Sequence, residues 1–75
     1  MDKNSIIKAL EEIAVMLELK NDNPFKIRAY RNAAHALETA DIEINKNTKI
    51  DELTIINGIG KSIAENILEF ATGNN

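Results

Sequence analysis

The sequence contains no cysteine, no tryptophan, a single proline and only three glycines. Without cysteine, the chain can form neither a disulfide nor a metal site built on thiolates. No stretch approaches the ~20 apolar residues of a membrane-spanning helix, and the first residues lack the long apolar segment of a signal peptide. We therefore expect a soluble intracellular protein that has no contact with a membrane.

The overall charge gives no indication of a nucleic-acid partner. Nine Lys and Arg stand against twelve Asp and Glu, so the net charge is -3 and the chain as a whole repels a polyanion. An apolar fraction of 44% indicates an ordinary folded domain. Seventy-five residues make one small domain, residues 1–75, whose core is expected to be only marginally stable.

Basic residues are gathered in the middle of the chain. Residues 24–37 contain Lys26, Arg28, Arg31 and His35 but no acid, and all twelve acidic residues fall outside this range. A chain of negative net charge attracts a polyanion only where its cations lie together on one face. Any such attraction must therefore be local.

Two amphipathic helices are predicted in the first half. Apolar residues from Ile6 to Leu17 recur at spacings of three and four, which predicts a helix over about residues 4–19. Asn23 supplies an N-cap and Pro24 a proline at the first helical position, so a second helix is expected to start at Pro24. Its apolar face lies roughly 100° from a stripe that carries Arg28 and Arg31.

The second half is also expected to be helical. Residues 41–47 alternate apolar and polar side chains, but a single short segment has no sheet to join, so we expect an extended linker. Thr48 is the predicted N-cap of a short third helix that ends near Ile56. A fourth helix is expected over Lys61–Thr72, with Gly73 as its stop. The predicted fold class is all-α, a small four-helix domain.

The turn between the third and fourth helices has the sequence Asn57-Gly58-Ile59-Gly60. Gly58 and Gly60 are expected to adopt backbone angles closed to other residues, and Ile59 to pack in the core. The N–H groups of Gly60, Lys61 and Ser62 then have no partner within the helix and can bind a phosphate oxygen. The alternative is a tight turn with a purely structural role.

The segment Leu53–Ala64 resembles the helix-hairpin-helix motif, which has two glycines, an apolar residue between them and two flanking helices. Because phosphates occur in every DNA sequence, binding by this motif would be independent of sequence and sensitive to salt. The Lys61 ammonium and the helix dipole would add attraction.

A second segment, Asn23–Ala34, carries the string Phe-Lys-Ile-Arg-Ala-Tyr-Arg-Asn-Ala-Ala. Together with the glycine turn it resembles the N-terminal domain of family X DNA polymerases, bacterial members above all, over about residues 5–73. The resemblance implies a domain that binds the 5′-phosphate side of gapped DNA. It also implies a polymerase core downstream in the same protein, a monomeric state, a role in base excision repair and a cytoplasmic, nucleoid-associated location.

The DNA contacts that we predict come from these two segments. The resemblance adds Lys26 and Tyr30, which occupy positions of the family's phosphate-binding lysine and tyrosine. The predicted DNA-binding residues are Gly58, Gly60, Lys61, Ser62, Lys26, Tyr30, Arg28 and Arg31.

Catalysis by this domain is not expected. In the animal repair polymerase of the family, a lysine amine attacks the C1′ aldehyde of an abasic sugar and the resulting Schiff base promotes β-elimination. That nucleophile falls at Asn66 in this chain, and a supporting lysine falls at Ser62. Neither side chain can form an imine, so we assign no catalytic residue and no cofactor. Residual lyase activity through Lys26 or Lys61 is the enzymatic alternative.

The resemblance further implies a monovalent cation, Na⁺ or K⁺, at the hairpin. Its ligands would be the backbone carbonyls of Thr54, Ile56 and Ile59.

Each of these assignments has an alternative that does not involve DNA. Tyr30 can pack its ring in the core, and Arg28 and Arg31 can form a solvated face that pairs with Glu38 or with acids of the first helix. The whole chain can also be a protein-interaction domain that does not bind DNA, which suits its negative charge.

Overall fold

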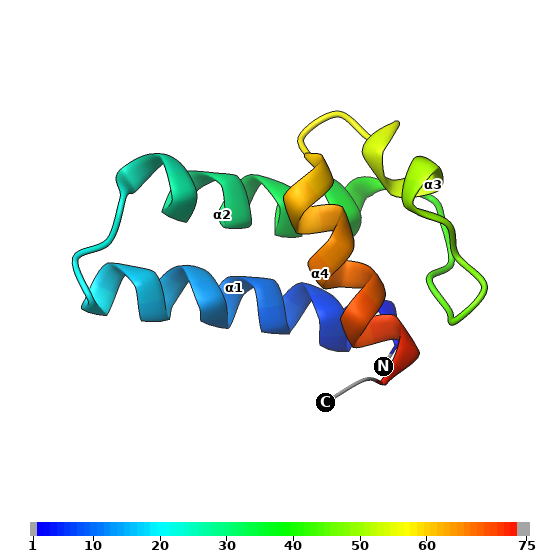
Figure 1. The fold of residues 1–75 in the computed structure, drawn as a ribbon, viewed down its shortest axis with the longest axis horizontal. Helices are drawn as coiled ribbons and strands as arrows, with labels where there is room; N and C mark the ends of the chain where they lie inside the picture. The colour runs from blue at the N-terminus through cyan, green and yellow to red at the C-terminus, as the bar shows by residue number, and fades with distance from the viewer. Residues whose placement is uncertain (1, 74–75) are drawn as a thin grey trace.

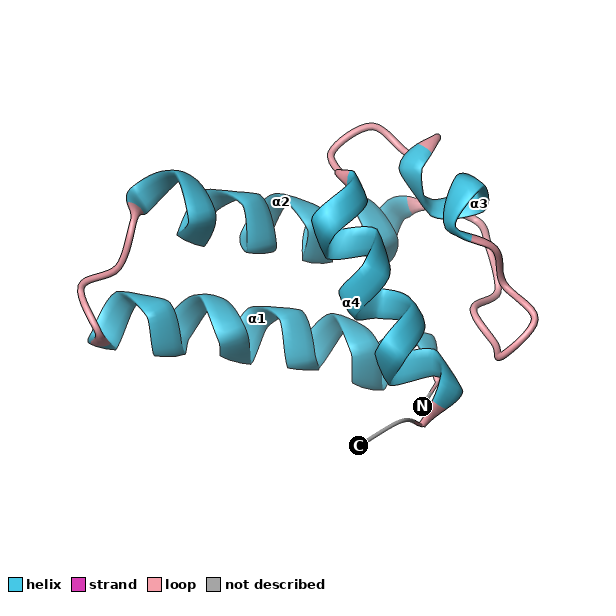
Figure 2. Cartoon of the chain, in the orientation of Figure 1, coloured by secondary structure: helices cyan, strands magenta, loops and turns pink. Residues whose placement is uncertain are grey.

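The computed structural model describes residues 2–73 and shows four helices and no strand in that range (Figures 1 and 2). The helices are α1 (Lys3–Leu19), α2 (Pro24–Thr39), α3 (Ile50–Thr54) and α4 (Lys61–Thr72). The predicted all-α fold class is confirmed. None of these helices is both long and apolar enough to cross a membrane.

Local signals set the ends of the long helices. Asp2 caps α1, since its carboxylate accepts from the N–H of Ser5 at 2.8 Å. This hydrogen bond lowers the pKa of Asp2 from its usual value. Asn23 caps α2 and accepts from the N–H of Phe25 at 2.9 Å, with Pro24 in the first turn as predicted. Gly73 ends α4 in the left-handed conformation, at φ 71°.

The start of the third helix differs from the prediction. Lys49, not Thr48, is the N-cap of α3, and the Thr48 hydroxyl instead accepts from the N–H of Asn45 at 2.9 Å. Thr48 is thereby used to close a turn of the linker before the helix begins. The Glu52 carboxylate accepts from the N–H of Lys49 at 3.1 Å, so the first turn is still stabilised by an acid.

α3 also ends earlier than predicted, at Thr54. The N–H of Ile56 donates to the carbonyl of Leu53 at 3.0 Å, three residues back, so the chain tightens after the last helical residue. The residues up to Gly60 therefore form the turn into α4 and not a continuation of α3.

α1 and α2 run antiparallel, and α4 crosses them near the end that holds the N-terminus (Figure 1). The ammonium of Lys3 at the start of α1 donates to the carbonyl of Ala40 at the end of α2, which fixes this alignment. Residues 41–45 of the linker after α2 have no regular secondary structure, whereas residues 46–47, also expected to be extended, form a turn, and Ile44 is buried in the core.

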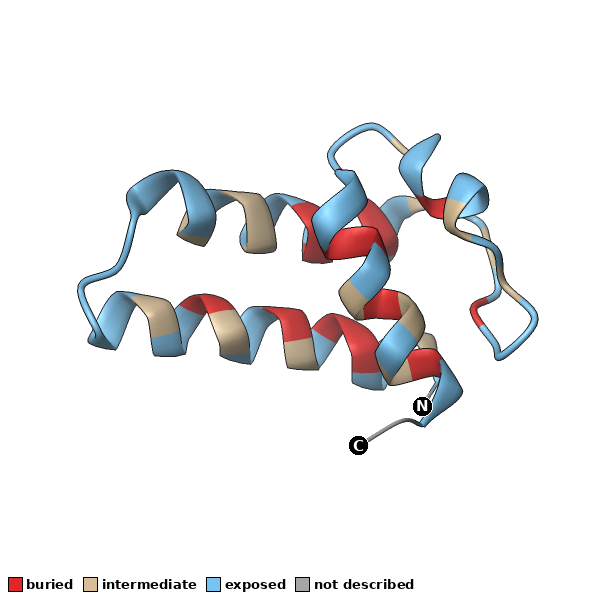
Figure 3. Cartoon of the chain, in the orientation of Figure 1, coloured by how far each residue is buried: buried red, intermediate tan, exposed pale blue. Residues whose placement is uncertain are grey.

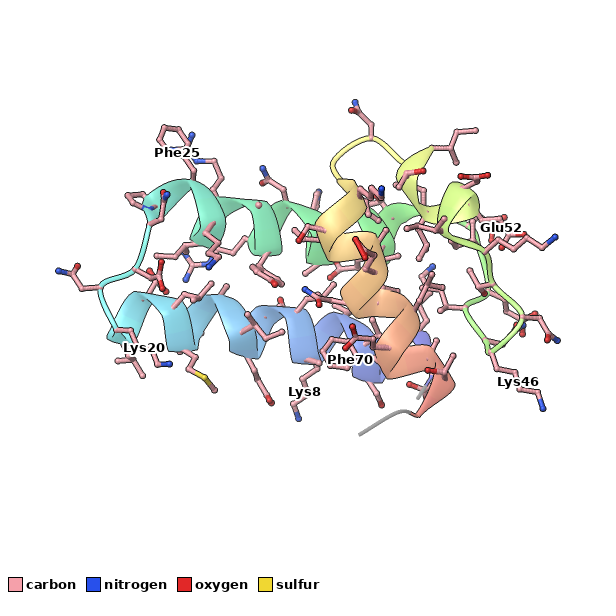
Figure 4. All side chains as sticks on the ribbon, in the orientation of Figure 1. Lys8, Lys20, Phe25, Lys46, Glu52 and Phe70 are labelled. Carbon is pink, nitrogen blue, oxygen red and sulfur yellow. The ribbon has the colours of Figure 1, made fainter. Side chains whose placement is uncertain are left out.

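The core lies at one end of the α1–α2 pair, under α3 and α4 (Figure 3). The other end, around the α1–α2 connection, buries no residue between Val15 and Tyr30. Leu19 and Phe25 there are 83% and 76% exposed, and Phe25 extends outward from α2 (Figure 4). The fully buried large side chains are Ile6, Leu10, Leu37, Leu53 and Ile67.

Candidate nucleic-acid interface

Gly58 brings the turn into contact with α2. Its φ is +102°, a region that favours glycine, and an added Cβ would lie 3.4 Å from the Cβ of Ala36 and 3.6 Å from the carbonyl oxygen of Asn32. The next residue, Ile59, is buried in the core as predicted. The backbone angle therefore favours glycine at position 58, and the turn lies within van der Waals reach of α2.

Gly60 behaves differently, which corrects the expectation that both glycines use angles closed to other residues. Its φ of -85° and ψ of 170° are extended angles that any residue adopts. A Cβ added there would meet nothing within 4 Å. Nothing inside the fold requires glycine at this position, so its small size leaves open space directly at the start of α4.

Free backbone donors lie at this open surface. Gly60 is the N-cap of α4 without a side-chain cap, and its carbonyl accepts from the N–H of Ala64 at 2.9 Å. Within residues 2–73, the N–H groups of Gly60, Lys61 and Ser62 have no hydrogen-bond partner. These exposed groups and the positive end of the helix dipole make a favourable place for an anion.

α2 lies opposite the start of α4 at this surface. A hollow of about 320 Å³ lies between its first turns and the start of α4. Lys26 and Lys61 line it from opposite sides, and no carboxylate is among its lining residues. Of the predicted DNA-binding residues, the structure brings these together here: Lys26, Tyr30, Gly58, Gly60, Lys61 and Ser62.

Tyr30 joins this hollow to the core. Its ring is half-buried against the core, while its phenolic oxygen accepts a hydrogen bond from Nδ2 of Asn66 at 2.7 Å. The two interpretations of Tyr30, core packing and a polar role, are therefore compatible. Sequence reasoning missed this contact, although Asn66 lies one turn after Ser62 and thus on the same face of α4.

Arg28 and Arg31 lie elsewhere on α2. They line a separate hollow with Glu18 of α1, and the guanidinium of Arg31 forms an ion pair with the Glu18 carboxylate. His35 similarly lies beside Glu11 and Glu38. The prediction that Arg31 could pair with an acid of the first helix is confirmed. Arg28 and Arg31 thus line a hollow that contains a carboxylate, whereas the hollow at the glycine turn contains none.

The three carbonyls predicted to hold a monovalent cation lie around the turn. That of Ile56 accepts from the N–H of Ile59 at 3.1 Å, and no backbone N–H of the described residues donates to those of Thr54 and Ile59. Thr54 and Ile59 line one shallow depression together with Asp51. Carbonyl oxygens without donors can coordinate a hard cation, but Lys61 lines this depression as well as Asp51.

Comparison with known proteins agrees with this geometry. A family model described as a helix-hairpin-helix domain matches residues 1–75. The chain is 46% identical over 70 residues to the DNA polymerase/3′-5′ exonuclease PolX of Bacillus subtilis (strain 168). That match covers 93% of this chain but only 12% of the polymerase. No solved structure matches the chain. The chain therefore belongs to the helix-hairpin-helix domain family, in a form similar to part of a family X DNA polymerase.

Proposed function

We propose that this chain binds DNA through its phosphates, independently of sequence, as the DNA-binding module of a family X repair polymerase. The observation that carries this proposal is the hollow between α2 and the glycine turn. Residues with free backbone N–H groups, two lysines and a tyrosine line this hollow, and no acidic residue does. Such a set of donors matches a phosphate group and carries no information on base identity.

The net charge of -3 is compatible with this role, because the charge is unevenly distributed. The ion pair of Arg31 with Glu18 neutralises part of the basic stripe, whereas Lys26 and Lys61 have no partner among the salt bridges of residues 2–73. Arg28 and several lysines are also without an ion pair in the described residues, but Lys26 and Lys61 are the two that lie beside the free N–H groups. Attraction to DNA is therefore concentrated at the hollow.

We further propose that the DNA is gapped, that the bound group is its 5′-phosphate, and that a polymerase domain follows in the same protein. A terminal phosphate carries more negative charge than an internal phosphodiester, so a site with two lysines and several N–H donors favours it. The similarity to PolX supports the polymerase context. The domain acts as a monomer in this arrangement.

In this proposal the domain has no lyase activity. Asn66 donates a hydrogen bond to Tyr30 at the position of the family's nucleophilic lysine, and an amide cannot form an imine. The alternative nucleophiles, Lys26 and Lys61, both line the hollow. Borohydride reduction in the presence of abasic DNA tests them, because a covalent adduct would show that one of them forms a Schiff base.

A monovalent cation at the carbonyls of Thr54, Ile56 and Ile59 remains part of the proposal. Replacement of Na⁺ and K⁺ by a bulky organic cation at constant ionic strength should weaken DNA binding if the ion stabilises the turn. Equal affinity in both buffers would remove the ion from the proposal.

Fluorescence anisotropy with a 5′-phosphorylated, one-nucleotide-gapped duplex tests the main proposal. We expect binding at low salt that weakens steeply at moderate salt, since phosphate contacts release counterions. Lys61→Glu should weaken binding strongly, whereas Lys46→Glu, the same charge change at an exposed linker residue, should have little effect. Negligible binding by the unmodified chain at every salt concentration would contradict the proposal.

A second candidate function is favoured by the surface around α3. Ile55 is 82% exposed and lines a hollow with four acidic side chains, a combination suited to a protein partner. The acidic lining residues are Asp41, Glu43, Asp51 and Glu52. If protein interaction were the main role, Lys26→Glu and Lys61→Glu would leave partner binding intact, and a selective loss of DNA binding would count against it.

A further inference from the structure

Asn66 of α4 and Tyr30 of α2 connect the two helices that form the hollow. Nδ2 of Asn66 donates to the phenolic oxygen of Tyr30 at 2.7 Å, across 36 positions of sequence. In the part of the chain that the structure describes, one other hydrogen bond joins two side chains, that between Arg31 and Glu18. The Asn66–Tyr30 bond is therefore an unusual feature, and it lies next to the proposed phosphate.

The direction of this hydrogen bond determines what Tyr30 can offer to a ligand. A phenol has one O–H donor and two acceptor lone pairs. The amide N–H of Asn66 donates to one lone pair of the phenolic oxygen of Tyr30. The hydrogen of the phenol therefore remains free for another acceptor. Tyr30 lines the hollow, so that acceptor can be a ligand held there.

The other groups around the hollow agree with an acceptor as ligand. The ammonium groups of Lys26 and Lys61 are donors only, and so are the free N–H groups at the start of α4. None of them can accept the hydrogen of Tyr30. A phosphate group has several acceptor oxygens and no donor, so it is the kind of ligand that can accept from the phenol and from these donors.

We propose that Asn66 is a positioning residue that fixes Tyr30 as a hydrogen-bond donor to a phosphate of bound DNA. This inference rests on the proposed function and adds a role for a side chain that does not itself line the hollow. Both side chains are partly buried, so water competes weakly for their hydrogen bond. Asn66 stands where the resemblance places the family's nucleophilic lysine. In this chain it positions Tyr30, which in turn contacts the phosphate.

A double-mutant cycle tests this role. The variants are Tyr30→Phe, Asn66→Leu and the double variant, each titrated with the same gapped duplex carrying either a 5′-phosphate or a 5′-hydroxyl. The measured quantity is the ratio of the two affinities, which a general loss of stability would not change. Glu65→Gln changes an exposed residue of α4, the helix that carries Asn66. It is the control for effects of any substitution in this helix.

We expect Tyr30→Phe to lower the preference for the 5′-phosphate by about tenfold, the size of one hydrogen bond to a charged group. Asn66→Leu should lower it by about threefold to fivefold. The double variant should not fall below Tyr30→Phe alone, because Asn66 acts only through the phenol.

Two results would overturn the inference while the proposed function stands: an unchanged preference in Asn66→Leu, or fully additive effects in the double variant. Absence of a 5′-phosphate preference in the unmodified chain would overturn the inference together with the proposal that the 5′-phosphate is the bound group, whereas absence of any DNA binding would overturn the main proposal. If Asn66→Leu does not fold, Asn66→Asp replaces it. Its carboxylate can only accept, so adding Tyr30→Phe to Asn66→Asp should cost nothing, and a further loss would contradict the inference.

Discussion

The two ends of the α1–α2 pair are built differently. At one end α3, α4 and the linker cover both helices and bury the large side chains, whereas the connection from Leu19 to Pro24 is exposed (Figure 3). The proposed phosphate site lies where the covered end meets the open one, with Lys26 and Tyr30 from the first turns of α2. Stability therefore resides at one end, and binding depends on how that end positions the start of α2.

The strongest test of this difference is the same substitution at each end. Leu53→Ala removes a fully buried side chain and should cost about 2–5 kcal/mol of unfolding free energy, which is enough to unfold much of so small a domain. Leu19→Ala, at a side chain that is 83% exposed, should change it by less than about 0.5 kcal/mol. Denaturation followed by circular dichroism measures both, and comparable losses would show that the open end is also packed.

The two glycines of the turn extend the comparison to the site itself. Gly58→Ala should cost about 1–3 kcal/mol, because φ is +102°, a backbone angle that side chains rarely adopt. Gly60→Ala should alter stability by less than about 0.5 kcal/mol, because its angles are ordinary and its surroundings open.

The methyl group at position 60 should nevertheless weaken DNA binding severalfold, since it occupies the space in front of the free N–H groups. Thermal melts and anisotropy titrations of the two variants separate the effects. Gly60→Ala with unchanged affinity would indicate that the phosphate does not approach this point.

Charge reversal on the two faces of α2 is expected to have unequal effects on affinity. Lys26→Glu should weaken DNA binding by about tenfold or more, because it removes a charge-assisted hydrogen bond in the hollow. Arg28→Glu makes the same charge change on the face that carries Glu18 and should weaken it by only about twofold. Equal losses in the titration would mean that DNA also covers the arginine face.

The smallest expected effect concerns the N-cap of α1. The pKa of Asp2 is lowered in the folded chain, so its ionised form stabilises the fold above the usual Asp pKa, and this contribution is lost as the pH falls through the lowered value. Asp2→Asn keeps a capping oxygen without a titrating group. Asp2 should therefore give the higher melting temperature near pH 7, and its advantage over Asn should decrease as the pH falls below the usual Asp pKa. A difference independent of pH would show that the charge has no role.

Features that depend on near neighbours in sequence were predicted well. The apolar spacing of α1, the Asn23–Pro24 start of α2 and the Gly73 stop of α4 are all confirmed, because each signal acts within one helical turn. One local feature was not. Thr48 was expected to cap a helix but closes a turn, and nothing in the local sequence distinguishes these two uses of a hydroxyl.

At the site, the motifs were predicted but the contacts between them were not. The turn and the Lys26 segment were recognised separately, but their approach across one hollow depends on how α4 crosses α2. The bond between Asn66 and Tyr30 and the ion pair of Arg31 with Glu18 depend on that packing as well. Spacing within a segment predicts neither the Asn66–Tyr30 bond nor which acid of the first helix pairs with Arg31.

The contact of Gly58 with Ala36 has a thermodynamic consequence for ligand binding. Because the turn rests directly on α2, the backbone donors of the turn and the side chains of Lys26 and Tyr30 share one support. The site is thus preorganised, and little backbone conformational entropy remains to be lost on association. Bound and free domains should accordingly have nearly the same backbone, in contrast to sites that fold around their ligand.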